Sequence, residues 1–83
     1  MPKGDLGYPK TSVTLVSSWL DRFEEFDNLR GASDLEQEIV LELHQLPGRS
    51  LRVWRLNQRL SGSMSQVRAA VGNLEEAGVV RLA

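Results

Sequence analysis

The sequence predicts a mostly helical domain with a three-helix core, a short two-stranded β element and one additional amphipathic helix at its amino-terminal end. Apolar residues recur at helical spacing in four segments, each of which can bury one face. Two of these segments begin with Ser and carry Glu or Gln three residues later, the pattern of a capping box. The last segment ends at a Gly that is followed by β-branched residues, which favour a strand.

A chain of 83 residues forms one small domain, which at this size buries about 60 to 65% of the surface of its unfolded chain. Residues 1–11 contain two prolines and two glycines without any periodic pattern, and we expect them to be a flexible lead-in. Residues 12–83 are predicted to be a single domain. It divides into an amino-terminal helix over residues 12–29 and a core over residues 34–83.

The amino-terminal helix is predicted from a broad apolar face. That face contains Val13, Val16, Trp19, Leu20, Phe23 and Phe26. With Leu15 included it spans about 160°, which is wider than the roughly 100° that a helix needs to dock on one core. One interpretation is that a domain this small uses every aromatic side chain to enlarge its core. The other is that Trp19, Phe23 and Phe26 form a protein interface, through which two copies of the chain make a homodimer.

The next helix is predicted over residues 34–46. Ser33 and Glu36 form a capping box at its start, and Pro47-Gly48 follows its end. Its core stripe consists of Leu35, Ile39, Leu43 and Leu46. After the turn, residues 49–51 are expected to form a very short strand that pairs with residues 79–82.

The last two helices are predicted over residues 53–60 and 64–77. Their apolar stripes are formed by Val53, Leu56 and Leu60 and by Val67, Val71 and Leu74. Between the two helices, Gly62 can take the positive φ that turns the chain sharply. Ser63 and Gln66 then form the second capping box, and Gly78 supplies the left-handed cap at the far end.

The segment SMSQVRAAVGNLEEAGVVRL, residues 63–82, resembles the recognition helix and first wing strand of the winged helix-turn-helix superfamily of DNA-binding domains. It is most similar in pattern to MarR-type regulators and to the small winged-helix domain that closes the DNA-processing protein A family. The resemblance covers residues 34–83 and implies that helix 64–77 lies in the major groove of double-stranded DNA. The sequence departs from the family at Ala83, where it ends without a second wing strand.

The net charge of -1 is unevenly distributed along the chain. Before residue 46, four basic side chains stand against nine acidic ones, a balance of -5. From Leu46 onward, six arginines stand against two glutamates, a balance of +4. The half that resembles a DNA-binding domain is therefore basic, although the chain as a whole lacks the strongly basic character of a nonspecific DNA binder.

Candidate DNA contacts follow from the resemblance, because a recognition helix reads bases mainly through its first two turns. The base-reading candidates are Ser65, Gln66, Arg68, Ala69 and Asn73. Among them, Arg suits guanine, and Gln or Asn suits adenine through two hydrogen bonds. The candidates for binding phosphates are Arg49, Arg52, Arg55 and Arg59. Phosphate contacts position a protein on the duplex without reading its sequence.

The alternative function is a winged-helix module that binds another protein and no DNA. The face of helix 64–77 has one arginine and no lysine, and Trp54 lies beside the apolar stripe of its own helix, where it could anchor a partner. An enzyme is not expected, because no catalytic spacing surrounds His44 and a cofactor or metal site has no ligand set. Without cysteine, signal peptide or membrane span, we expect a cytoplasmic protein.

Overall fold

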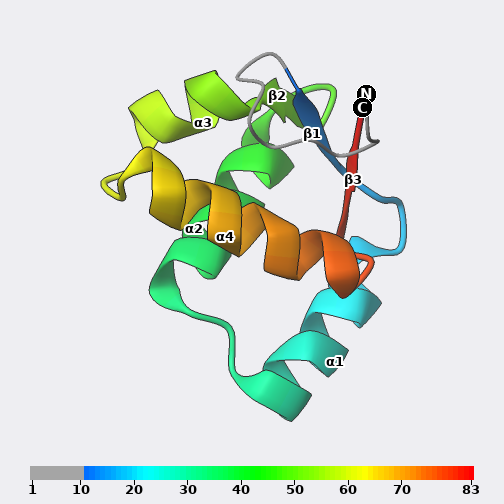
Figure 1. The fold of residues 1–83 in the computed structure, drawn as a ribbon. Helices are drawn as coiled ribbons and strands as arrows, with labels where there is room; N and C mark the ends of the chain where they lie inside the picture. Colours follow the sequence, from blue (N-terminus) through cyan, green and yellow to red (C-terminus); the bar gives the residue numbers. More distant parts are fainter. Residues whose placement is uncertain (1–10) are drawn as a thin grey trace.

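The computed structural model describes residues 11–83, which form four helices and a three-stranded antiparallel sheet (Figure 1). In chain order the elements are β1 Ser12–Leu15, α1 Trp19–Arg30, α2 Asp34–Gln45, β2 Ser50–Arg52, α3 Val53–Arg59, α4 Met64–Glu76 and β3 Val80–Leu82. A mostly helical domain with a small β element is therefore confirmed. The predicted flexible lead-in of residues 1–11 lies, apart from Thr11, outside the described residues.

Helices α2 and α4 begin where the sequence predicts, because both capping boxes form. The hydroxyl of Ser33 accepts from the backbone N–H of Glu36 at 3.2 Å, and the Glu36 carboxylate accepts from the N–H of Ser33 at 2.8 Å. Ser63 and Gln66 make the same two bonds at 3.2 and 2.9 Å. Each box satisfies two backbone donors that a helix start otherwise leaves unpaired.

Residues 12–15 form a strand, so the predicted helix over residues 12–29 is wrong at its amino-terminal end. Only the part from Trp19 onward is helical, as α1. Val13 and Leu15 are buried while Ser12 and Thr14 are half-buried on the other side, which is the alternation of a strand. A stretch this short fits the helical and the strand period equally well, and its β-branched residues fit a pleated surface between two neighbouring strands.

The sheet has three strands instead of the predicted two, in the order β2-β1-β3. The predicted pairing of residues 49–51 with residues 79–82 is wrong, because β1 lies between β2 and β3 and is antiparallel to both. Ser12 and Ala83 exchange main-chain hydrogen bonds of 2.9 and 3.0 Å. The beginning of β1 therefore lies beside the end of the chain after β3 (Figure 1).

Two glycines are required for different reasons. Gly78 ends α4 with a φ of +78°, which favours Gly, and a Cβ there would also displace the guanidinium of Arg22, 2.7 Å away. The positive φ predicted for Gly62 is wrong, because Gly31 and Gly78 are the glycines of residues 11–83 with positive φ. A Cβ on Gly62 would lie 3.2 Å from the side chain of Leu35, a close contact that would require Leu35 to shift slightly.

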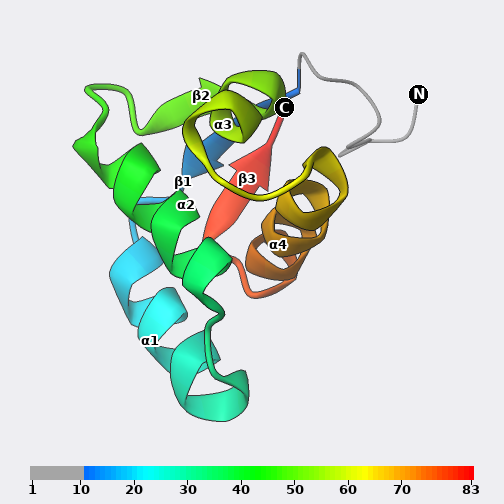
Figure 2. The same ribbon diagram turned by 90° about the vertical axis from the view of Figure 1, so that its left-hand side faces the viewer.

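One core is shared by the inner face of the sheet and the helices. Its fully buried large side chains are Val13, Ile39, Leu43, Val53, Leu56, Val67, Val71, Leu74, Val79 and Leu82. Helix α1 lies at the opposite end of the molecule from α3 and contributes Phe26 to the core (Figures 1 and 2). Consequently α1 lies near one end of α4 and leaves the outer side of α4 open.

The position of β1 can be tested by core substitutions. Val13→Ala should lower the free energy of unfolding by about 2 kcal/mol and Leu15→Ala by about 3 kcal/mol, because each leaves a cavity. The matched control Thr14→Ala removes a 2.8 Å hydroxyl bond to Ser50 and should cost about 1 kcal/mol or less. Urea unfolding followed by circular dichroism measures all three. A loss for Thr14→Ala as large as that for Val13→Ala would contradict the strand.

Candidate nucleic-acid interface

Helix α4 has a buried side and an outer side that match its sequence pattern. Val67, Val71 and Leu74 are buried completely, as predicted, and Ala70 joins them. The exposed residues are Ser65, Gln66, Ala69, Asn73 and Glu76, which we call the outer side of α4. Four of the five predicted base-reading residues are thus brought together on one exposed surface. The first three turns of the helix carry no carboxylate there.

Arg68 is the base-reading candidate that does not lie on the outer side of α4. It is only partly exposed, and its Nε is buried without a hydrogen-bond partner among the described residues. Helical spacing places it on the same side as Glu75, which borders a hollow together with Val80 and Leu82 of β3. Arg68 therefore lies next to the outer side of α4, on the flank that is closer to the sheet.

The side-chain amides of Gln66 and Asn73, which are predicted to read adenine, each make one hydrogen bond within the domain. The side-chain oxygen of Gln66 accepts from the Ser63 N–H in the capping box. The side-chain amide of Asn73 donates to a carboxylate oxygen of Glu36 at 2.9 Å. Recognition of adenine by two hydrogen bonds needs both the oxygen and the nitrogen of one amide. Each internal bond fixes the orientation of its amide, so a two-bond contact with adenine has to be made in that orientation, with the remaining N–H groups and lone pairs.

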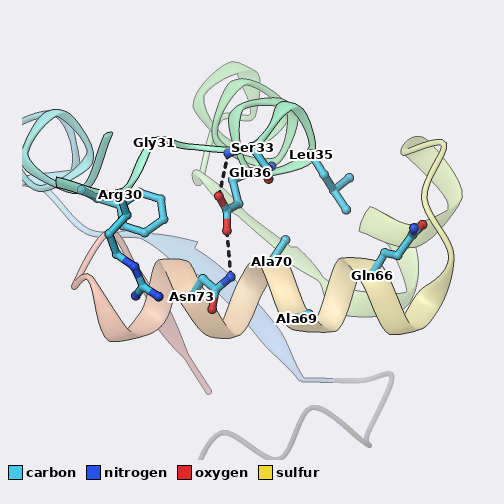
Figure 3. Close-up of a pocket in the computed structure, with 10 residues that line it drawn as sticks. Arg30, Gly31, Ser33, Leu35, Glu36, Gln66, Ala69, Ala70 and Asn73 are labelled. Carbon is cyan, nitrogen blue, oxygen red and sulfur yellow. Dashed lines mark hydrogen bonds between the residues drawn. The ribbon is translucent and has the colours of Figure 1, made fainter. Parts of the chain in front are cut away.

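The bond between Asn73 and Glu36 joins α4 to α2 (Figure 3). Glu36 is the buried charged residue of the described chain, at 5% exposure, and each of its oxygens has a donor. One oxygen accepts from Ser33 and the other from Asn73. The capping box predicted the first of these bonds from the sequence. Nothing in the sequence indicates the second, which joins residues 37 positions apart.

The four arginines predicted to bind phosphates do not form one cluster. Arg59 lies 3.5 Å from the carboxylate of Glu42 on α2, and the guanidinium of Arg55 lies 4.9 Å from the centre of the Trp54 ring. Arg49 is exposed in the loop before β2, with a φ of +51°, and Arg52 is exposed at the end of β2. All four side chains are exposed, but they come from three separate places, which are the loop before β2, strand β2 and helix α3.

The outer face of the sheet carries a basic residue that the sequence did not single out. Arg81 stands opposite Thr14 in the register, and Arg52 stands opposite Ser12, so arginines on both edge strands flank hydroxyl groups on β1. The strand alternation of β3, in which Arg81 is exposed between two buried residues, is the signal that could have indicated it.

A groove runs between α4 and the segment that joins α1 to α2 (Figure 3). Its volume is about 410 Å³. Arg30 and Asn73 lie toward one end, Leu35 and Gln66 toward the other, and Ala69 lies between them on α4 (Figure 3). Sequence reasoning missed Arg30, because its place beside α4 depends on how α1 packs.

The predicted aromatic interface of α1 is mostly occupied by internal packing. Phe26 is buried at 6% exposure, so it belongs to the core, and its ring centre lies 6.3 Å from that of Phe23. The Trp19 ring lies 5.2 Å from that of His44, and Trp19 and Phe23 are both half-buried against the core. Self-association through this helix stays a prediction. Trp54 is half-buried, and its role as an anchor for a partner stays a prediction.

Comparison with protein-family models, with curated proteins and with solved structures finds no match to this chain. Within residues 11–83, His, Asp and Glu side chains are nowhere grouped in the way that a bound metal ion requires. The helices of this part of the chain are all too short or too polar to cross a membrane.

Asn73 can be tested as a structural residue. Asn73→Ala should lower the free energy of unfolding by about 1 to 3 kcal/mol, because it leaves a buried oxygen of Glu36 without a donor. Ser65→Ala is the matched control, since Ser65 is exposed on the same helix without an internal side-chain bond, and its effect should stay within about 0.5 kcal/mol. Thermal and urea unfolding provide the measurement. Equal stability of the two variants would show that the Asn73 bond contributes nothing.

Proposed function

We propose that this domain binds double-stranded DNA and that α4 is its recognition helix. The observation that carries the proposal is the outer side of α4, which is exposed, small and free of carboxylates over its first three turns. Arg30 lies on one flank of this surface and Arg68 on the other. A helix that enters the major groove needs a slim polar surface toward the bases and cations toward the two phosphate strands beside it.

The arrangement of strands supports a winged-helix relationship for residues 34–83. The order α2-β2-α3-α4-β3 is the order that the resemblance implies, with α3 and α4 as the helix-turn-helix. Strand β1, which precedes the region of resemblance, is the antiparallel neighbour of β3.

The electrostatics favour modest affinity. With Arg30 and Arg68 as the flanking phosphate contacts, log K should fall with log salt at a slope near -2, at about -0.9 for each phosphate neutralised. Arg55 and Arg59 have internal partners in Trp54 and Glu42, which reduces what they offer to DNA. Measurements should therefore begin at low salt, where phosphate attraction is least screened.

The proposal is tested by selecting duplexes from a random pool at about 20 mM salt and measuring their affinity by fluorescence anisotropy. Ala69→Glu places a carboxylate on the outer side of α4 and should weaken binding about tenfold or more. Gln45→Glu adds the same charge at an exposed position of α2 and should change affinity less than about twofold. If no duplex is enriched and none binds at low salt, the proposal is wrong.

A second candidate, a module that binds another protein, is favoured by the internal bonds of Gln66 and Asn73 and by the half-exposed Trp54 beneath Arg55. Aromatic and arginine side chains together are typical of the centres of protein interfaces. The DNA selection discriminates between the two candidates. A folded domain that enriches no duplex would leave this candidate in place.

A further inference from the structure

Arg30 is a cation without a counter-charge beside the proposed recognition helix. It is the last residue of α1, it is exposed, and it makes no ion pair within residues 11–83. Its side chain extends toward α4 near Asn73 (Figure 3). Glu76 and Glu25 border a neighbouring hollow together with Arg30, yet neither forms an ion pair with it.

Glu36, a carboxylate in the lining of the groove, forms no ion pair with Arg30 in residues 11–83. Both oxygens of Glu36 are taken, one by the backbone N–H of Ser33 and one by the side-chain amide of Asn73. Without an ion pair in this part of the chain, the five N–H donors of Arg30 remain directed to solvent and to the groove.

The far end of the groove also offers a donor. Gln66 accepts in the capping box through its oxygen, which leaves its NH₂ group free. Gln66 and Asn73 are seven residues apart on α4, which places them about 10 Å apart along the helix. Between them the wall is formed by Ala69 and Ala70, whose small side chains leave room for a chain to lie against α4. The groove thus suits an extended anionic backbone.

We infer that Arg30 binds a backbone phosphate of the DNA strand that runs beside α4, in the groove between α4 and the α1–α2 segment. This inference rests on the proposed function, because it places the groove next to a helix inserted in DNA. A phosphate strand borders a recognition helix on each side, and the groove is the border on the side of α1. An acidic peptide offers similar charge, but the groove continues directly into the outer side of α4, which favours DNA.

The experiment uses a selected duplex in which single phosphates are replaced, one at a time, by uncharged methylphosphonates. At one or two adjacent positions on one strand, the replacement should weaken binding of the unchanged protein about tenfold. Arg30→Ala should bind the unmodified duplex about tenfold more weakly, with a salt slope smaller by about 0.9. At the same positions, replacing the phosphate by a methylphosphonate should not weaken the binding of the Arg30→Ala variant any further.

Two further variants separate contact from folding. Arg30→Lys keeps the charge but loses the planar fork, so its affinity should lie between those of the unchanged protein and Arg30→Ala. Gln66→Glu keeps the capping box and its stability but places a carboxylate in the groove, so it should weaken DNA binding without lowering the urea midpoint. Gln45→Glu serves again as the control for added charge.

The outcomes distinguish the two proposals. If the unchanged protein binds DNA and every methylphosphonate affects Arg30→Ala as it affects the unchanged protein, the phosphate contact of Arg30 is wrong and DNA binding stands. If no duplex binds, the proposed function itself fails. In that case binding of a poly-glutamate peptide that is lost in Arg30→Ala would assign the groove to acidic proteins and overturn the DNA phosphate contact.

Discussion

The rest of the domain depends on β1, because this strand provides hydrogen bonds to both of the other strands. β2 and β3 have three residues each, too few to form a stable pair without a third strand and a core beneath them. Val13 in the centre of β1 is completely buried and stands opposite a leucine on each side. The chain then leaves β1 through a bond between the Val16 N–H and the Val79 carbonyl, so the start of α1 is fixed at the edge of the sheet. From there the length of α1 carries Arg30 to the side of α4.

Glu36 links the stability of the fold to the chemistry of the groove. A buried carboxylate that loses one of its partners becomes an uncompensated charge, so its two bonds strongly favour one placement of α4 against α2. The same bonds determine which hydrogen-bonding groups beside the groove remain available to an external ligand. Asn73 keeps its oxygen and one amide N–H for an external ligand, while Arg30 keeps all its donors. Glu36 therefore links the placement of α4 against α2 to the groups that line the groove.

Features that depend on neighbours in the sequence were predictable, and features that depend on distant packing were not. The capping boxes at Ser33 and Ser63 involve residues three positions apart, and both formed as predicted. The strand at residues 12–15 was missed because four residues fit either period, and the competing strand partners lie near positions 51 and 81. The bond from Asn73 to Glu36 and the place of Arg30 depend on how α1, α2 and α4 pack, which no local pattern reports.

In the proposed DNA complex, the outer side of α4 would read sequence less specifically than its residue types indicate. An amide held by an internal bond cannot turn freely toward a base, so a two-bond contact with adenine forms only in the orientation that the internal bond permits. Arg68 lies on the flank, so the surface that faces the bases is formed largely by Ser65, Ala69 and the free ends of Gln66 and Asn73. Specificity would then come mainly from the shape of the duplex and the placing of its phosphates.

This arrangement gives the charge asymmetry of the chain a role in orientation. The exposed carboxylates of α1 and α2 are Asp21, Glu24, Glu25, Asp27, Asp34 and Glu38. They repel a duplex that approaches α1 or α2, whereas the arginines on the flanks of α4 attract it. A net charge near zero limits the overall attraction between the domain and DNA. The uneven distribution of charge still favours one direction of approach. The domain would meet DNA with α4 first, and the acidic half would oppose the nonspecific encounters that a uniformly basic domain accepts.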